Sequence, residues 1–166
     1  METSNRSVVH LPPGEGKSFW VMGSELNTLK LVAEDTDGAF SLMESETPSQ
    51  GGPPPHIHHR EDEWLYVLEG EYELLDNDRT IRATAGSFVF LPKGRLHTFK
   101  NVGSTTGKLL LLYKPAGFEK YFAEEGIGEP ATDRSSPPIQ SGPPDIERVV
   151  SVARKYGIEI PPPPGH

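Results

Sequence analysis

The stretch HIHHREDEWLYVLEG, residues 56–70, is the part of the sequence that decides the fold. Three of the six histidines in the chain fall within its first four residues. His56 and His58 are two positions apart, so on an extended strand both imidazole rings leave the same face. Two such rings can converge on one ion, and a metal that accepts imidazole together with carboxylate suits this composition. The stretch therefore predicts a metal site built on a β-strand.

A second stretch, GSFVFLPKGRLHTFKN at residues 86–101, carries the histidine that completes the pattern. Pro92 presets a turn and Gly94 completes it, so we expect the strand that carries His97 to run back beside the first stretch. Gly86 is expected to mark a corner where a side chain would crowd the backbone. The spacing thus predicts that His97 approaches the first two histidines.

Both stretches resemble the two motifs of the cupin family. The first motif is glycine, five residues, His-x-His, three or four residues, Glu, six residues, glycine. The second is glycine, five residues, Pro-x-Gly, two residues, His, three residues, Asn. Only the leading glycine is missing, because position 50 is glutamine and glycines follow at 51 and 52. The matching residues are His56, His58, Glu63, Gly70, Gly86, Pro92, Gly94, His97 and Asn101.

This resemblance, over roughly residues 40–115, implies an all-β cupin barrel, which is a double-stranded β-helix or jelly-roll. It also implies one divalent first-row transition metal (Mn, Fe, Co, Ni, Cu or Zn), bound by His56, His58, Glu63 and His97. Asp62 competes with Glu63 because the motif allows two gap lengths, but the distance to Gly70 and the residue type favour Glu63. His59 is out of phase with the ligands, so we expect it to be exposed.

Short apolar runs separated by turn signals extend from residue 19 to residue 113. Glycine and proline number seventeen each and are spread between these runs, which is typical of a sandwich or barrel of many short strands. The residues Asp76-Asn77-Asp78 predict a tight hairpin turn. The predicted strands cover residues 19–22, 28–33, 39–43, 64–68, 72–75, 87–91, 96–99 and 108–113.

The pattern changes after Tyr113. Residues 117–124 predict a short helix, and a second helix is expected to begin at an Asp145 N-cap and to stop at Gly157. The four prolines at 161–164 predict an extended tail. The apolar face expected for the second helix consists of Ile146, Val149, Val150 and Ala153.

These boundaries predict two parts of one domain overall. Residues 1–116 would form the cupin barrel with its N-terminal strands. Residues 117–166 would form a C-terminal extension with short helices and a Pro-rich tail, packed on the barrel. The length of 166 residues suits a single compact unit.

Composition excludes several classes of protein. Sixteen basic and twenty-four acidic residues give a net charge of −8, which disfavours nucleic acid and anionic membranes as partners. The N-terminus has no apolar run long enough for a signal peptide, and no segment is long and apolar enough to span a membrane. We therefore expect a cytoplasmic protein. The absence of cysteine leaves only nitrogen and oxygen as metal ligands.

Several apolar residues are candidates for a substrate pocket. Phe99 follows His97 by two positions and should share its inward face, and Leu65 and Val67 share the parity of Glu63. Phe88 and Phe90 are expected to add apolar walls that suit a flat aromatic molecule.

Residues 56–70, followed by Pro115-Ala116-Gly117-Phe118-Glu119, look like the single-domain bacterial cupins that include quercetin 2,3-dioxygenases. This resemblance implies a metal-dependent oxidoreductase that cleaves the ring of flavonol-like phenolic substrates with dioxygen, with Glu63 as the catalytic base. The alternatives are a non-catalytic module that binds a metal or a small molecule, and a metal-assisted isomerase or cyclase. The apolar run 109–112 needs burial on both faces, which predicts a homodimer.

Overall fold

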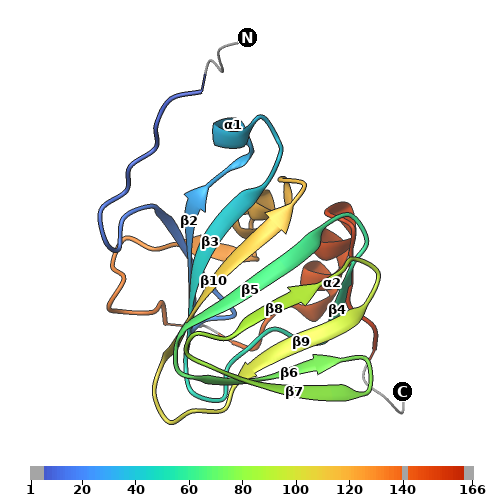
Figure 1. Cartoon of the computed structure of the whole chain (residues 1–166). Coiled ribbons are helices and arrows are strands. Elements are labelled where there is room, and N and C mark those ends of the chain that lie inside the picture. The colour runs from blue at the N-terminus through green and yellow to red at the C-terminus, as the bar shows by residue number, and fades with distance from the viewer. Residues whose placement is uncertain (1–5, 140–141, 163–166) are drawn as a thin grey trace.

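The computed structural model describes residues 6–139 and 142–162, and its strands form two antiparallel sheets that curve around a shared core (Figure 1). The larger sheet has the order β11-β1-β2-β3-β10-β5-β8, and the smaller has the order β12-β4-β9-β6-β7. This arrangement confirms the predicted all-β class. The strands of the larger sheet are β1 (Lys17–Val21), β2 (Glu25–Leu31), β3 (Ser41–Thr47), β5 (Asp62–Glu69), β8 (Phe88–Leu91), β10 (Gly107–Lys114) and β11 (Gly128–Pro130). Those of the smaller sheet are β4 (His56–His58), β6 (Glu71–Asp76), β7 (Arg79–Thr84), β9 (Leu96–Asn101) and β12 (Ile158–Glu159).

The core of the barrel follows the two-residue period of its strands. In β10, Leu109 and Leu111 are fully buried, whereas Leu110 and Leu112 lie on the outer face and remain partly exposed. Burial of each such leucine contributes about 1.5–3 kcal/mol to folding. The leucines of β10 therefore lie on both faces of the sheet. Only those on the inner face are fully buried by the described residues.

The predicted hairpin at residues 76–78 is confirmed, with Asn77 in the left-handed region at φ 53° between β6 and β7. The sequence did not indicate β7 itself, because this strand is polar and lies at the edge of the smaller sheet. Of its residues only Ala83 is buried, so its hydrophobic pattern is weak.

Gly52 explains the displaced glycine of the first motif. Its φ is 149°, and a Cβ atom at this position would lie 2.0 Å from the carbonyl oxygen of Phe99 in β9. Only glycine lets the segment before β4 approach β9 so closely. The requirement for a glycine is therefore met at position 52, while Gln50 adopts a left-handed conformation at φ 65°.

Three short helices accompany the strands in the described part of the chain: α1 (Ala33–Thr36), the 3₁₀ helix η1 (Phe118–Ala123) and α2 (Ile146–Lys155). The predicted Asp145 N-cap is confirmed, since its Oδ1 accepts a hydrogen bond from the backbone N–H of Arg148 at 2.9 Å. The predicted end at Gly157 is also confirmed, at φ 77°.

The apolar face predicted for α2 was partly wrong. Val149 and Ala153 are buried as predicted, but Ile146 is 59% exposed, Val150 is only half-buried, and Val152 completes the buried face. The reason is that the first residue of the helix points away from the barrel while the later turns pack on it. Of the predicted proline tail, positions 163 and 164 lie outside the described residues.

The C-terminal segment reaches the strand that carries two of the predicted metal ligands. After α2, β12 pairs with β4, so that Ile158 lies opposite His58. Figure 1 shows α2 on the same side of the barrel as β4. This pairing places the end of the chain against the histidine strand.

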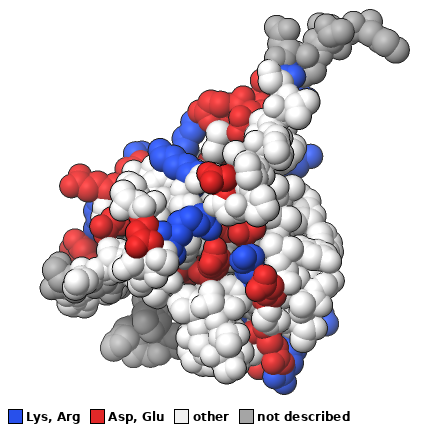
Figure 2. All heavy atoms as spheres, turned by 90° about the vertical axis from the view of Figure 1, so that its left-hand side faces the viewer, with Lys and Arg blue, Asp and Glu red and all other residues white. Residues whose placement is uncertain are grey.

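Charged side chains of both signs are intermingled on the face shown in Figure 2. Among the pairs that the structure forms, Arg134 Nη2 lies 2.9 Å from Glu46 Oε1, and Lys108 Nζ lies 3.9 Å from Glu69 Oε1. No helix among the described residues is long and apolar enough to cross a bilayer.

Candidate metal centre

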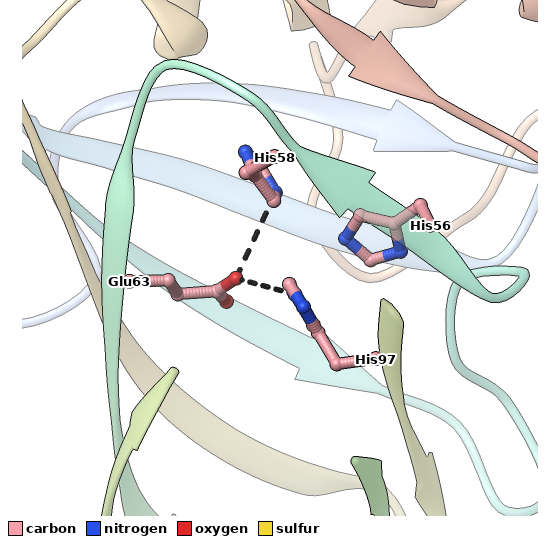
Figure 3. A group of neighbouring side chains, drawn as sticks. All are labelled: His56, His58, Glu63 and His97. Carbon is pink, nitrogen blue, oxygen red and sulfur yellow. Dashed lines mark hydrogen bonds and ion pairs between the residues drawn. The ribbon is translucent and has the colours of Figure 1, made fainter. Parts of the chain in front are cut away.

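Four side chains from three strands meet inside the barrel (Figure 3). His56 and His58 extend from β4, Glu63 from β5 and His97 from β9, and one ligand atom of each lies within 4.8 Å of the others. The register of β4 and β9 places His56 directly opposite His97. His58, Glu63 and His97 are buried, and His56 is partly exposed. The structure thus brings together the four residues predicted as ligands.

Glu63 is the centre of the contacts between these residues. Its Oε2 lies 3.0 Å from His97 Nε2 and 3.7 Å from His58 Nε2. Tyr113 donates its hydroxyl hydrogen to Glu63 Oε1 at 3.3 Å. Side chains from two other strands, β9 and β10, therefore contact the two carboxylate oxygens.

The outer ring nitrogens of all three histidines have hydrogen-bond acceptors. His56 Nδ1 lies 2.8 Å from the carbonyl oxygen of Pro54, and His97 Nδ1 lies 3.0 Å from that of Arg95. His58 Nδ1 lies 3.3 Å from Glu61 Oε2. When Nδ1 carries the proton, the Nε2 lone pair is free to bind a cation, which is the usual arrangement around a metal.

One of these Nε2 atoms has no hydrogen-bond partner in the described part of the chain. His58 Nε2 is fully buried and unpaired. A buried polar atom without a partner costs about 1–3 kcal/mol, so this atom fits a ligand position better than a structural one. The donor set of three imidazoles and one carboxylate suits a divalent first-row ion.

Glu61 is a residue whose importance the sequence interpretation missed. It is only 3% exposed, and its carboxylate orients His58. The signal that could have found it is parity, because Glu61 lies two residues before Glu63. Asp62 points elsewhere: its Oδ1 accepts a hydrogen bond from the backbone N–H of Lys93 at 3.0 Å. This contact settles the choice of inward carboxylate in favour of Glu63.

The protonation states of the cluster favour the binding of a cation. Burial, and then the charges on His58 and His97, lower the pKa of His56 to about 3, so this imidazole is neutral at physiological pH. Burial alone would raise the pKa of Glu63, but the hydrogen bond from His97 and the three nearby imidazoles bring it below its ordinary value. Glu63 is therefore ionised.

The model of the cupin domain family matches residues 43–113, which include all four residues of the cluster. Residues 43–113 thus match a cupin domain, and the two antiparallel sheets agree with that fold. It is 28% identical over 120 residues to quercetin 2,3-dioxygenase of Bacillus subtilis, an alignment that covers 72% of this chain and 34% of that one. The chain thus spans about a third of the length of this curated relative.

Solved cupins share the fold at low identity. A protein described as a predicted oxalate decarboxylase from Thermotoga maritima superposes with a TM-score of 0.59 at 23% identity, covering 66% of this chain and 99% of that one. An RmlC-like cupin from Shewanella frigidimarina superposes with a TM-score of 0.56 at 18% identity, covering 70% and 96%. These similarities confirm the predicted cupin fold.

The cupin barrel holds a largely apolar pocket beside the cluster, with a cavity volume of about 90 Å³, and the pocket is partly open to solvent. His56 and Glu63 form part of its wall, and so does Phe99, where we expected it. Sequence interpretation did not anticipate that residues after position 117 line this pocket. These are Phe118, Tyr121, Phe122, Ile127, Val149, Ile158 and Ile160.

The other predicted pocket residues lie elsewhere. Leu65 and Val67 face inward but are packed into the core, each 0% exposed, outside the pocket wall. Phe88 and Phe90 are 62% and 47% exposed on the outer face of the larger sheet, so their assignment to the pocket was wrong. In the pairing of β8 with β5, both stand opposite outward positions, Tyr66 and Trp64.

Proposed function

We propose that this cupin is a metal-dependent oxidoreductase that cleaves the ring of a flavonol-like phenolic compound with dioxygen. The observation that carries the proposal is the convergence of three imidazoles and one carboxylate at the wall of an apolar pocket. Such a pocket suits a flat aromatic molecule. The similarity to a quercetin 2,3-dioxygenase over most of the chain supports this substrate class.

His56, His58, Glu63 and His97 are the residues that would hold the ion. A divalent first-row metal bound there would supply Lewis acidity and, with a redox-active element, electron transfer. Glu61 Oε2 accepts a hydrogen bond from His58 Nδ1, which keeps His58 in the tautomer that leaves Nε2 free.

Glu63 is the residue we assign to proton transfer. It is ionised, buried and within the pocket wall, so it can take the proton from the substrate hydroxyl. Tyr113 keeps its own proton, because burial and the charge on Glu63 raise its pKa well above 10. Its hydroxyl therefore remains a donor that holds Glu63 Oε1 in place.

The overall reaction balances without a further co-reactant. The two C–C bonds that flank the hydroxylated ring carbon and the O–O bond of dioxygen break, and one C–O bond forms between each oxygen atom of dioxygen and one of the two carbons left behind. That carbon leaves with its own oxygen as carbon monoxide, and the hydroxyl proton goes to the ester product. The apolar walls formed by Phe99, Phe118 and Phe122 exclude water from the reacting end of the substrate.

The test is to load the protein separately with each candidate ion and to measure oxygen uptake and carbon monoxide release with quercetin. We expect one molecule of each gas per molecule of quercetin. Glu63→Gln should reduce the rate by about 100-fold or more, the usual contribution of a general base, while Asp62→Asn should not.

The outcome also separates the alternatives. Absence of oxygen uptake with every ion would overturn the proposal. Turnover of a small molecule without oxygen would indicate an isomerase or cyclase. Tight binding without turnover would indicate a binding module.

A further inference from the structure

The pocket contains a second carboxyl group that lies on a different strand from the metal cluster. Glu25 is the first residue of β2, and the strands β3 and β10 lie between β2 and the Glu63 strand β5. Glu25 and Glu63 nevertheless line the same pocket. Among the described residues that line this pocket, these two bear carboxyl groups and none is lysine or arginine.

Glu25 is held by hydrogen bonds that leave half of its carboxyl group free. Its Oε1 accepts from Asn27 Nδ2 at 3.3 Å and from Ser45 Oγ at 3.3 Å. Its Oε2 forms no hydrogen bond with any described residue. Asn27 is fully buried, and its own Oδ1 also has no partner in the described structure. The free oxygen of Glu25, in the wall of an apolar pocket, is thus available for a hydrogen-bond donor.

The position of Glu25 is costly for folding. Burial raises its pKa to about 7, only partly offset by its bonds to Asn27 and Ser45. Burial and the charge on Glu25 also contribute to the raised pKa values of Tyr72 and Tyr113, and no lysine or arginine is among the described residues that line the pocket. A desolvated carboxyl group without an ion-pair partner in a pocket is a common sign of function.

We propose that Glu25 determines ligand specificity by binding a hydroxyl group of an uncharged ligand whose other end reaches the metal cluster. The free oxygen of Glu25 accepts the hydroxyl hydrogen, and the apolar walls contact the carbon skeleton between the two ends. Since two carboxylates and no basic side chain line the pocket, ligands with an anionic group near Glu25 are rejected. This inference rests on the proposed binding of a small molecule, and names the chemistry that selects it.

The test compares ligands that differ only in the group offered to Glu25. Quercetin and 3-hydroxyflavone share the hydroxy-ketone end, but only quercetin has further ring hydroxyls. A second pair is 2-naphthol and 2-naphthoate, which replaces the hydroxyl by an anion. Dissociation constants are measured by titration calorimetry on zinc-loaded and on metal-free protein, so that no turnover intervenes.

Glu25→Met removes the acceptor at similar side-chain length, and Glu25→Gln keeps the size while removing the charge. The matched control is Glu44→Met, since Glu44 lies on the neighbouring β3 and faces Lys108 on the outer surface. We expect the wild type to bind quercetin and 2-naphthol at least about tenfold more tightly than their partners, as for hydrogen bonds to charged groups. Glu25→Met should abolish both preferences, and the control should retain them.

The two Glu25 variants test the role of this residue independently of each other. If Glu25→Met fails to fold, Glu25→Gln decides, because it should admit 2-naphthoate and weaken the preference for quercetin. Equal discrimination by the wild type and both variants would overturn the role of Glu25, even if quercetin is oxidised. Discrimination that depends on Glu25, without oxygen uptake, would support the inference and refute ring cleavage. Failure of the wild type to bind any of the four probes would contradict both proposals.

Discussion

Glu25→Gln should make stability less sensitive to pH than in the wild type. In the folded protein the pKa of Glu25 is raised from 4.5 to about 7 by burial. The folded state therefore favours the protonated carboxyl group, which imposes no penalty below pH 4.5. Between pH 4.5 and about 7 the unfolded state releases the proton of Glu25 while the folded state keeps it, so the penalty grows across this range and is complete above about pH 7.

The size of this free-energy penalty follows from the shift in the pKa of Glu25. At 1.36 kcal/mol per pKa unit, the ionised carboxyl group destabilises the fold by about 3 kcal/mol at pH 8.5. Glutamine carries no charge and avoids this penalty. The variant should thus be about 3 kcal/mol more stable than the wild type at pH 8.5, with a much smaller difference at pH 4.5.

The assay is urea unfolding of metal-free protein at several values between pH 4.5 and pH 8.5, followed by tryptophan fluorescence. The difference between variant and wild type cancels the contributions of the histidine cluster, which both proteins share. Glu44→Gln serves as a control with an outward carboxyl group on the neighbouring strand. A difference that does not change with pH, or that shrinks as the pH rises, would refute the assignment of Glu25 as a desolvated acid.

Three further predictions concern the cluster, the backbone and the outer surface. Glu61→Gln should weaken zinc binding by about 10–100-fold in a chelator competition because His58 loses its orienting carboxylate, whereas equal affinities would contradict that role. Gly52→Ala should lower the free energy of unfolding by about 3 kcal/mol or more, as its Cβ would meet a backbone oxygen of β9; a loss below about 1 kcal/mol would refute the close approach. We predict that the wild type sediments as a homodimer and Phe88→Asp as a monomer in analytical ultracentrifugation, since this exposed ring lies on the outer apolar face; equal sedimentation coefficients would exclude that face as the interface.

The metal cluster could be predicted because the two stretches resemble the motifs of the cupin family, and local geometry agrees with that resemblance. The two-residue period of a strand places His56 and His58 on one face, and the Pro-x-Gly turn returns His97 beside them. In the structure Gly94 strengthens this arrangement, because its backbone N–H donates to the carbonyl oxygen of His58 at 2.7 Å. Asn101 also has a local task, since its Nδ2 donates to the carbonyl oxygens of Thr47 and Thr105.

The residues of the pocket were harder to predict from the sequence, because the pocket depends on strand register and on contacts between residues distant in sequence. Phe88 and Phe90 alternate with Val89, and a shift of one residue exchanges the inner and outer faces of such a strand. Glu25 lies far from both motifs in the sequence, and nothing in its neighbourhood indicates a pocket. The wall contributed by Ile158 exists only because β12 returns to pair with β4.

The most direct test of the metal centre is an anomalous-scattering map from crystals of the protein loaded with one first-row metal, recorded at its absorption edge. We predict one peak per chain, within bonding distance of His56, His58 and His97 through Nε2 and of a Glu63 carboxylate oxygen. A map without a peak at this position, or with metal bound only elsewhere, would contradict the proposed centre.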